Sequence, residues 1–577
     1  MNLKIIKHLN LILFIQALFL LFAAKNVNSL SNNSLLLPSN YEGLYYPSDN
    51  VVILNISNFQ SSVYNCNSSW IVEFYSHWCG HCIRFSPLWK TVGKNLQNWN
   101  KAVQIAVIDC ADDENSPICR DNHVISYPTL KYFSANSKPG TFGSDVKDVK
   151  DVAVLETIIL NLVEVEERAG RGSSWPNILP YSAEDLKNIW KSVAENVKYI
   201  TLVTESPDSI IGTSMIMNFQ NVKELHIGRV LANTTNTTIT LSFLQRDKTE
   251  TTLKINNATT DIIEKTIKDK LEAQGVHVVL PDTKKDTEIK EVPTISKEQM
   301  ANLEYAHKAG DVVFQLDIER ALRYSLNHEV AMSENIDGEK MEALKNYINV
   351  LVSYFPKKNN GIRYLLSLKE LLKNRSSITG ESFRKFSTAF AKQLSPVFTG
   401  KDEWIGCQGS LNFRRGFPCG MWTMFHTLTV NFANMNNIQK QDDPAQVLKA
   451  MHGYIKSFFG CRWCKKHFVE MSAERHLFDV KGFDESILWL WRAHNQVNKR
   501  LAGDVTEDPM HKKIQYPTAT DCPSCRDGND TWIESNVLSY LKNKYSYSAI
   551  NFYESALKTN NLHYIGKDVP YLYFSRK

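Results

Sequence analysis

The stretch IVEFYSHWCGHCIRFSP, residues 71–87, joins an apolar strand run to a helix that opens on the pair Cys79 and Cys82. Backbone N–H groups and the positive dipole end at a helix N-terminus stabilise a thiolate at Cys79, and His81 is expected to add to this effect. A more stable thiolate makes the matching disulfide a stronger oxidant. The stretch therefore predicts a redox-active thiol centre. An inert structural bridge is the weaker alternative, because a two-residue loop between cysteines is strained and reducible.

Two further features bear on the chemistry of this centre. Glu73 is a charged residue inside a run expected to be a buried strand, and it is a candidate proton acceptor for Cys82. The alternative for Glu73 is a sheet-edge residue that faces water. At Tyr127-Pro128 a proline begins a strand, where a cis peptide bond would bring a backbone edge towards Cys79.

Strand and helix patterns alternate around this centre. Apolar runs such as VVILNIS and AVQIAVIDC alternate with helical runs such as VAVLETIILNLVEVEER, which indicates an α/β sandwich over residues 45–168. After a linker at residues 170–176, a similar rhythm without cysteine predicts a second sandwich over residues 175–290. Helical periodicity then predicts a helix-rich spacer over residues 296–400, a helical block rich in Cys, Trp and His over 401–516, and a polar C-terminal segment over 517–577.

Composition narrows the function classes. With 43% apolar and 22% charged residues over a length of 577, the chain is expected to fold into several globular domains. The 66 Lys and Arg residues and the 61 Asp and Glu residues are scattered without a basic face, so the sequence gives no support for nucleic-acid binding. The 11 cysteines are too few for a disulfide scaffold, yet they include three Cys-x-x-Cys pairs.

The N-terminal residues predict a secretory protein. Residues 1–29 carry Lys4 and Lys7, an apolar run and then small residues, which is typical of a cleaved signal peptide; a retained signal anchor is the alternative. No second apolar run is long enough to span a membrane, so we expect no transmembrane anchor. An oxidising compartment favours redox chemistry over zinc at the Cys-x-x-Cys pairs. Sequons fit a glycosylated surface at Asn55, Asn67, Asn233, Asn236, Asn257, Asn374 and Asn529.

The stretch VEFYSHWCGHCIRFSPLWK, residues 72–90, resembles the active domain of a protein disulfide isomerase, within the thioredoxin superfamily. The resemblance covers about residues 45–168 and implies that Cys79 and Cys82 are catalytic. Cys110 and Cys119 follow the third strand of this region and are expected to form a supporting disulfide.

A second chemical centre surrounds Cys461 and Cys464. The segment before it, MHGYIKSFF, is helical, so this pair is not a second site of the thioredoxin kind. Aromatic faces with polar donors suit a flat cofactor with polar edges, although each face alone is typical of a helical core. Such residues recur at helical spacing on two predicted helices, with Trp422 and His426 on one and Trp491, His494, Asn495 and Asn498 on the other.

Three segments together resemble the flavin-linked sulfhydryl oxidase module of the Erv type: residues 407–430, CRWCKKHF (461–468) and LWLWRAHNQVNKRL (488–501). The resemblance implies a four-helix FAD domain, with Cys464 beside the isoalloxazine, Cys461 receiving electrons and a structural Cys407–Cys419 disulfide. It also implies cofactor contacts from Arg415, Trp422, His426, His467, Trp491, His494, Asn495, Asn498, Lys513 and Tyr516. Trp463 and Tyr516 depart from the common pattern, which has an acidic residue and Trp there.

Zinc held by Cys461/Cys464 and Cys522/Cys525 is the rival interpretation of the second centre. The two pairs are much further apart than the roughly 15 to 20 residues of the usual paired zinc motif, so zinc is disfavoured. Cys522 and Cys525 are instead expected to form an accessory disulfide without a derived role. Cys66 is left over, and a free or intermolecularly linked thiol is expected there.

The order of these parts resembles the quiescin sulfhydryl oxidase family. The resemblance implies two thioredoxin-like α/β sandwiches, a helical spacer and an all-α FAD domain. It implies an enzyme that introduces disulfide bonds into reduced unfolded or secreted proteins. Electrons would pass from Cys79/Cys82 to Cys461/Cys464, then to FAD and oxygen, yielding hydrogen peroxide. The relay requires a domain swing, for which the spacer and Gly170-Arg171-Gly172 are the expected hinges.

We expect a monomer in the Golgi lumen, outside the cell, or both. Two other functions stay open on the sequence. One is a disulfide isomerase-like oxidoreductase that uses only Cys79 and Cys82. The other is a non-enzymatic secreted interaction protein whose cysteines form inert bridges.

Overall fold

The computed structural model of the chain describes residues 43–172, 175–232, 238–246, 250–280, 295–357, 359–439 and 443–552. The predicted signal peptide, the sequons at Asn233 and Asn236 and the C-terminal residues 553–577 lie outside the described residues. Within those ranges, no helix is both long and apolar enough to cross a membrane.

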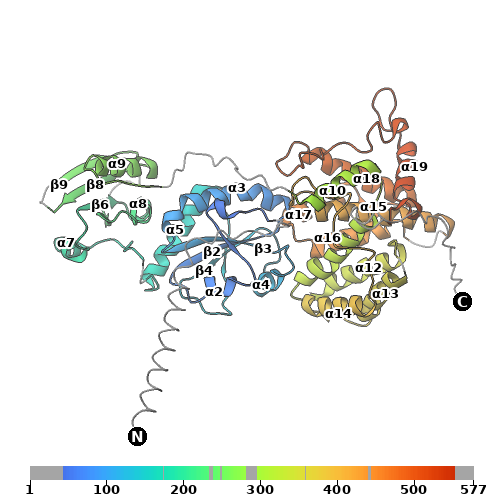
Figure 1. Cartoon of the computed structure of the whole chain (residues 1–577), viewed down its shortest axis with the longest axis horizontal. Coiled ribbons are helices and arrows are strands. Elements are labelled where there is room, and N and C mark those ends of the chain that lie inside the picture. The colour runs from blue at the N-terminus through green and yellow to red at the C-terminus, as the bar shows by residue number, and fades with distance from the viewer. Residues whose placement is uncertain are drawn as a thin grey trace, which may run out of the picture. The chain divides into compact units, whose positions relative to one another are not determined.

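A five-stranded sheet in the order β1-β3-β2-β4-β5 forms the first sandwich (Figure 1). The strands β1, β3 and β2 run parallel, whereas β4 and β5 are antiparallel to their neighbours. Helices α3 and α5 cover one face of the sheet, and α2 and α4 cover the other. Because helices cover both faces, every residue of the central strand β2 is buried. The element bounds are β1 (Val52–Leu54), α2 (Phe59–Val63), β2 (Ser69–Tyr75), α3 (Gly80–Asn95), β3 (Val103–Asp109), α4 (Ser116–Asp121), β4 (Thr129–Phe133), β5 (Ser144–Val146) and α5 (Val152–Arg168).

The second sandwich contains a four-stranded sheet in the order β7-β6-β8-β9. Side chains alternate between the two faces of β6. Ile200 and Leu202 pack in a separate cluster with α6 and α7, and Val203 points to the opposite face, which α8 and α9 cover. The apolar run SMIMNFQ, residues 214–220, lies mostly in helix α8. The bounds are α6 (Ala183–Lys187), α7 (Ile189–Ser192), β6 (Tyr199–Glu205), α8 (Ile211–Phe219), β7 (Leu225–Leu231), β8 (Ile239–Gln245), β9 (Glu250–Ile255) and α9 (Thr260–Glu272).

Direct bonds tie the two sandwiches together across the Gly170-Arg171-Gly172 linker. Trp99 Nε1 donates to Asn218 Oδ1 at 2.7 Å, and Arg229 Nη1 lies 3.2 Å from Glu164 Oε2. Just after the linker, Trp175 Nε1 donates to the Asn67 carbonyl at 2.9 Å. This linker connects the two sandwiches to each other, so it is not the hinge that the sequence suggested for motion between the two cysteine centres.

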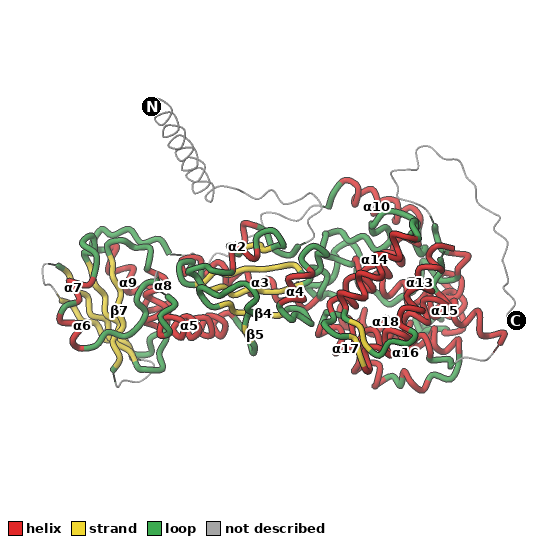
Figure 2. The backbone as a smooth tube through the Cα atoms, turned by 90° about the horizontal axis from the view of Figure 1, so that it is seen from below, coloured by secondary structure: helices red, strands yellow, loops and turns green. Residues whose placement is uncertain are grey.

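Helices dominate residues 295–552 (Figure 2). The long helices are α10 (Lys297–Ala309), α11 (Gln315–Tyr324), α12 (Gly338–Tyr354), α13 (Asn359–Leu372), α14 (Gly380–Gln393), α15 (Gly416–Gln439), α16 (Gln446–Phe458), α17 (Arg462–Glu474), α18 (Phe483–Leu501) and α19 (Glu534–Lys544). The two-residue strands β10 (Ile336–Asp337) and β11 (Ser377–Ile378) pair antiparallel. Short helical turns are η1 (Pro47–Asp49), η2 (Gln97–Trp99), η3 (Ser325–Glu329), η4 (Val330–Met332), η5 (Leu477–Asp479), η6 (Pro523–Cys525) and η7 (Tyr547–Ala549).

The helices of the expected spacer share a core with the helices that follow them. Helix α11 packs against α15, and α12 packs against α16. The Tyr347 and Tyr454 rings lie 4.5 Å apart, and the Tyr354 and Phe432 rings 5.0 Å apart. The expectation that the spacer acts as a hinge is therefore wrong, because rotating it against α15 and α16 would expose these buried rings to water. The predicted fold class, two α/β sandwiches followed by an all-α region, is confirmed.

Candidate active site

The first centre begins helix α3, with Cys79 as its N-cap. Cys79 and Cys82 are both free thiols and both fully buried. Burial raises the pKa of Cys79, but hydrogen bonds from the Cys82 thiol and from the Cys82 and His81 backbone N–H groups outweigh it and lower this pKa below its ordinary value. Burial raises the pKa of Cys82 well above its usual range. Cys79 is thus the residue suited to be a thiolate, while Cys82 keeps its proton.

His81 contributes differently from what the sequence suggested. Burial, with the nearby Arg84 and Arg462, lowers the pKa of His81, so the imidazole is neutral near pH 7. Its stabilisation of Cys79 comes from its backbone N–H and not from imidazolium charge.

Glu73 lies in the central strand β2 and is fully buried, which excludes a water-facing sheet edge. Tyr45 donates a hydrogen bond to Glu73 Oε2, and Oε1 has no hydrogen-bond partner among the described residues. Burial raises the pKa of Glu73 to about 8 despite the Tyr45 hydrogen bond. A carboxyl group that titrates in this range can take up or release a proton under physiological conditions.

The second centre begins helix α17, with Cys461 as its N-cap. Cys461 and Cys464 form a disulfide; Cys461 is fully buried and Cys464 half-buried. Helix α16 precedes this centre, so its setting differs from the strand-to-helix turn of the first centre.

The structure brings the two centres together. The Tyr127 backbone N–H, next to the cis peptide bond at Pro128, donates to the Gly460 carbonyl at 3.0 Å, and Tyr127 and Cys461 form a parallel β-bridge. On its other side, the Tyr127 carbonyl lies 3.9 Å from Cys79 Sγ. One short piece of backbone therefore links Cys79 to the residue that directly precedes Cys461.

Aromatic side chains surround this contact. The Trp78 ring lies 5.1 Å from Phe417 and 5.2 Å from Phe459, and its Nε1 donates to the Tyr324 hydroxyl at 3.0 Å. Trp463, the departure between the two cysteines, lies 5.4 Å from the His81 ring and 5.2 Å from His467. Trp463 therefore faces the first centre.

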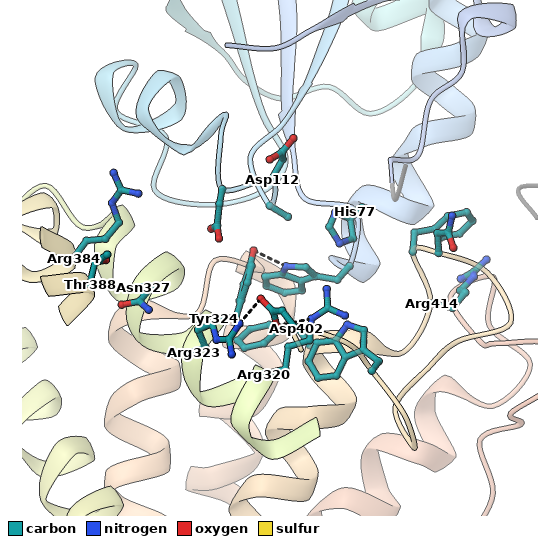
Figure 3. A pocket seen from close by; sticks show the side chains of 18 residues that line it. His77, Asp112, Arg320, Arg323, Tyr324, Asn327, Arg384, Thr388, Asp402 and Arg414 are labelled. Atoms are coloured by element: carbon teal, nitrogen blue, oxygen red, sulfur yellow. Dashed lines mark hydrogen bonds and ion pairs between the residues drawn. The ribbon is translucent and has the colours of Figure 1, made fainter. Parts of the chain in front are cut away.

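The rim of the contact is polar. Ion pairs cross it from Arg84 to Asp504 at 2.9 Å and from Arg120 to Glu381 at 2.6 Å. A cavity of about 390 Å³ lies beside Trp78, and Figure 3 shows its lining side chains. The sandwich supplies His77 and Asp112 to this cavity, and the helical region supplies the remaining labelled residues, namely Arg320, Arg323, Tyr324, Asn327, Arg384, Thr388, Asp402 and Arg414. A partly open, charged rim of this kind suits an interface that forms and separates.

Helices α15 and α18 bring the predicted aromatic faces together. The Trp422 and His494 rings stack 4.2 Å apart at an interplanar angle of 7°, and His426 Nε2 lies 3.1 Å from His494 Nδ1. Burial lowers the pKa of His426 to about 3 and that of His494 well below its usual range, so both imidazoles are neutral. His426 Nδ1 is buried without a hydrogen-bond partner in the described part of the chain.

The other predicted cofactor residues have varied surroundings. Trp491 Nε1 and the Asn495 amide donate to the Tyr516 carbonyl at 2.6 and 2.7 Å, and the Asn498 amide donates to the Ile514 carbonyl at 3.1 Å. These three side chains thus fix the segment that carries Lys513 and Tyr516. Arg415 Nη1 donates to the Gln408 carbonyl at 3.4 Å. Burial lowers the pKa of Lys513, and the charge of the nearby Arg415 lowers it further. His467 lies beside the Trp463 ring.

Several residues of this region were not predicted from the sequence. The Tyr545 ring stacks 4.9 Å from His426, and the Lys544 ammonium donates to the Tyr516 hydroxyl at 2.6 Å. Lys544 and Tyr540 also bind Asp311. Tyr540, Lys544 and Tyr545 lie in or next to the polar C-terminal helix α19, and no cysteine or aromatic pattern singles them out.

The remaining cysteines form local bridges. Disulfides join Cys110 to Cys119, Cys407 to Cys419, and Cys522 to Cys525. Cys66 is a free, half-buried thiol. Among the described residues no group of three or more His, Cys, Asp or Glu side chains could hold a metal ion.

Three protein families match successive regions of the chain. The thioredoxin family matches residues 50–156, the flavin adenine dinucleotide (FAD)-dependent sulfhydryl oxidase family residues 311–410, and the Erv1/Alr family residues 419–517. Sulfhydryl oxidase 1 of Cavia porcellus is 32% identical over 515 residues, which cover 88% of this chain and 82% of that relative. The chain belongs to the quiescin sulfhydryl oxidase family.

Other sulfhydryl oxidases are similarly related. Sulfhydryl oxidase 2 of Homo sapiens is 29% identical over 524 residues, covering 86% of this chain and 72% of the relative. The sulfhydryl oxidase fragment of human QSOX1 is 37% identical, with a TM-score of 0.38, over 42% of this chain and 98% of that one. As a member of this family, the chain is an FAD-dependent sulfhydryl oxidase that forms disulfides in thiol substrates and uses oxygen.

The side chains of this sulfhydryl oxidase fit its flavin cofactor. The parallel Trp422 and His494 rings offer a flat aromatic face, and the buried, unpartnered His426 Nδ1 offers a polar contact. Neutral imidazoles can donate or accept hydrogen bonds at the edge of a flat heterocycle without adding a buried charge.

Proposed function

We propose that this sulfhydryl oxidase passes electrons from substrate thiols through Cys79 and Cys82 to Cys461 and Cys464. The observation that carries the proposal is the backbone contact between Tyr127 and Gly460, which joins the edge beside Cys79 to the residue before Cys461. Thiol–disulfide exchange needs the attacking sulfur and the disulfide at contact distance, and this contact supports such an approach.

The internal exchange balances in two steps. The Cys79 thiolate attacks Cys461 Sγ, so that a Cys79–Cys461 bond forms, the Cys461–Cys464 bond breaks and Cys464 leaves as a thiolate. Cys82 then attacks Cys79 Sγ, which closes Cys79–Cys82 and releases Cys461. Glu73 takes the proton of Cys82, whose pKa is too high for it to ionise unaided. Two electrons leave the first centre and reduce the second.

The cofactor face lies on helices next to the second centre. We infer that FAD is held by Arg415, Trp422, His426, His467, Trp491, His494, Asn495, Asn498, Lys513 and Tyr516. When bound there, FAD supplies a two-electron acceptor that couples the Cys461/Cys464 dithiol to oxygen, with hydrogen peroxide as product. The chain's own contribution is a dry, neutral aromatic face on α15 and α18.

Substrate thiols need a different arrangement of the chain. Cys79 is fully buried in the contact with the helical region, so a substrate thiolate cannot reach it there. The first sandwich therefore separates from the helical region between the two half-reactions. Neither the Gly170-Arg171-Gly172 linker nor the spacer provides the hinge for this separation, because bonds join the two sandwiches and the spacer shares a core with α15 and α16.

A trapping experiment tests the relay. In a Cys82→Ser/Cys464→Ser chain, Cys79 and Cys461 are the cysteines left at the two centres, and Cys66 is the other free thiol. Oxidation by a small-molecule disulfide, which is reduced to two thiols, is expected to produce a Cys79–Cys461 disulfide detectable by peptide mass spectrometry. The matched Cys82→Ser/Cys461→Ser chain leaves Cys464 and is expected not to cross-link. Absence of the first cross-link, or equal cross-linking of both chains, would overturn the proposed relay.

We also propose reduced unfolded or secreted proteins as substrates, a monomeric enzyme, and residence in the Golgi lumen or outside the cell. The signal-peptide pattern, the sequons and the three local disulfides outside the two centres support this assignment. Glycosidase sensitivity of the cell-derived protein and light scattering of the purified protein test it. An unglycosylated cytosolic protein, or a stable dimer, would contradict the respective part.

A further inference from the structure

A buried glutamate, Glu329, lies beside the contact between the two centres. Glu329 ends the π-helical turn η3, which directly follows α11, and only 2% of its surface is exposed. Single π-turns in helices often occur at functional sites. In the part of the chain that the structure describes, Glu329 forms no ion pair, and its Oε1 is buried without a hydrogen-bond partner. A buried carboxylate with one unsatisfied oxygen is costly, so its retention needs a reason beyond packing.

The other oxygen of Glu329 holds the peptide next to Cys461. The Gly460 backbone N–H donates to Glu329 Oε2 at 2.6 Å, and the Gly460 carbonyl accepts from the Tyr127 N–H at 3.0 Å. Gly460 is thus held through its N–H by Glu329 of the helical region and through its carbonyl by Tyr127 of the first sandwich. Space there is tight, since a Cβ on Gly460 would lie 2.5 Å from the Tyr127 ring and 3.4 Å from Glu329 Oε1.

The charge of Glu329 acts on both sides of the contact. Burial raises its pKa to about 7, while His328 beside it and Lys465 on α17 favour the ionised form. Tyr324 on α11, Tyr454 on α16, and Tyr127 and Cys79 of the first sandwich also face this charge. At Cys79 the Glu329 charge opposes the hydrogen bonds that favour the thiolate. A less stabilised thiolate is a stronger nucleophile and a stronger reductant.

We propose that Glu329 is a positioning residue for the exchange between the two centres: it holds the Gly460 peptide against the Tyr127 edge and brings a negative charge to Cys79 only when the sandwich is docked. Docking then does two things at once. It aligns Cys461 for attack and shifts the Cys79/Cys82 pair from accepting electrons towards donating them. This inference rests on the proposed relay and adds a cause for its direction.

The rate of cross-linking in the Cys82→Ser/Cys464→Ser chain is the direct measurement, because a small-molecule disulfide accepts the two electrons in place of flavin and oxygen. The small disulfide first forms a mixed disulfide with Cys461, and Cys79 then displaces the small thiol. Adding Glu329→Gln keeps an acceptor for the Gly460 N–H but removes the charge, and cross-linking is expected to slow about tenfold. Glu319→Gln is the matched control. Glu319 is a buried glutamate on α11 whose Oε2 accepts from the Thr399 N–H and hydroxyl at 2.7 Å, within the helical region, so the rate with Glu319→Gln is expected to be unchanged.

The pH dependence separates positioning from mere folding support. Ionised Glu329 promotes the exchange, so the rate with native Glu329 is expected to rise as the pH increases through about 7. The Glu329→Gln chain is expected to lack this inflection. A second variant, Gly460→Ala, leaves Glu329 in place but adds a Cβ that meets the Tyr127 ring, and it is expected to slow cross-linking as well.

The outcomes distinguish this inference from the relay beneath it. A cross-link that forms equally fast with Glu329→Gln, with the same pH profile, overturns the role of Glu329 and leaves the relay intact. A cross-link that never forms, even with native Glu329, overturns the relay itself. Equal slowing by Glu319→Gln and Glu329→Gln would assign both glutamates to folding and contradict the inference.

Discussion

The two sandwiches each bury one glutamate in a central strand, and they treat it in opposite ways. In the first, Glu73 of β2 has no cationic partner among the described residues, one unsatisfied oxygen and a pKa raised by burial to about 8. In the second, Glu205 at the end of β6 binds Arg229 at 2.6 Å, and its other oxygen accepts from the Gly212 N–H and the Ser209 hydroxyl. The same architecture thus holds a titratable carboxyl in one copy and a fully satisfied ion pair in the other.

The difference shows that the fold alone does not make a redox site. The turn from β2 to α3 ends at Cys79, Cys82 lies in the first turn of α3, and the charge of Glu73 in β2 acts on Cys82. The turn from β6 to α8 carries Ser206 and Ser209 instead, and Arg229 neutralises its glutamate. In the second sandwich the buried Glu205–Arg229 ion pair therefore has a structural role. A hydrogen bond and an ion pair also join this sandwich to the first.

The largest expected effect comes from removing the nucleophile of the first sandwich. Cys79→Ser is expected to lower oxygen consumption with a reduced unfolded protein by about a thousandfold or more, to background, because the relay then has no entry point. Ser209→Ala in the matching turn of the second sandwich is expected to leave the rate unchanged. An oxygen electrode measures both. A Cys79→Ser chain that keeps a tenth of the rate would show that protein thiols reach Cys461 and Cys464 directly.

Opposite effects on stability are expected at the two buried glutamates. Glu205→Gln leaves the buried Arg229 with Glu164, at 3.2 Å, as its remaining carboxylate partner beside two backbone carbonyls, and this costs about 3 to 5 kcal/mol. Glu73→Gln removes a charge that has no partner. Since folding raises the pKa of Glu73 from 4.5 to about 8, its stabilising contribution is complete below pH 4.5 and is lost as the pH rises through 8.

Glu73→Gln is therefore expected to be more stable than the native chain at pH 9, by about 1.4 kcal/mol for each unit of the pKa shift. At pH 4 the two chains are expected to be similar. Urea unfolding followed by tryptophan fluorescence at both pH values checks this. Destabilisation of the same size by both substitutions would remove the contrast between the sandwiches.

A kinetic effect of intermediate size is expected at Glu73. Glu73→Gln cannot accept the Cys82 proton, and general-base contributions of this kind are worth about a hundredfold. Release of a pre-formed mixed disulfide at Cys79 is expected to slow by about this factor at pH 8, and its rise with pH through about 8 is expected to disappear. Quenched-flow alkylation measures the release. Glu205→Gln, if it folds, is expected to retain the native pH profile.

The smallest effect is expected at the rim of the docked contact. The side chains of Arg84 and Asp504 are 33% and 26% exposed, so their ion pair is worth about 0.2 to 1 kcal/mol. Arg84→Ala is expected to slow the cross-linking of Cys79 to Cys461 by about fivefold at most, and not at all in 1 M salt. Lys187→Ala breaks an exposed pair within the second sandwich and serves as the control. A loss that persists in high salt would mean that Arg84 acts on Cys79 or His81.

Several elements of the fold and of the candidate site were predictable from local sequence patterns. The alternation of strands and helices predicted both sandwiches because burial between two helical layers demands long apolar runs. The strand-turn-helix context identified Cys79 and Cys82, and helical spacing brought Trp422, His426 and His494 onto facing helices. Each of these signals repeats over a few residues, which is why it can be read from one chain.

Longer-range features gave no such signal. Glu329 lies in an ordinary helical run, and only the packing of α11, α16 and α17 brings it against Gly460. The sequence predicted a separate spacer over residues 296–400, because helical periodicity shows that one face of a helix is apolar but not which helix covers that face. In the structure α15 and α16 cover it, so the expected hinge shares one core with these helices.

The sequence by itself determined the family's chemistry and the parts that carry it: two Cys-x-x-Cys pairs proposed as redox centres, their order along the chain, two sandwiches of which one carries cysteines, and the residue types proposed for a flavin face. Local patterns suffice for this because nucleophile, helix start and aromatic spacing are neighbours in the chain. The tertiary structure decided which groups meet. The contact of Tyr127 with Gly460, the lone charge of Glu329 beside it and the neutralised Glu205 depend on residues tens to hundreds of positions apart, which only packing and burial bring together.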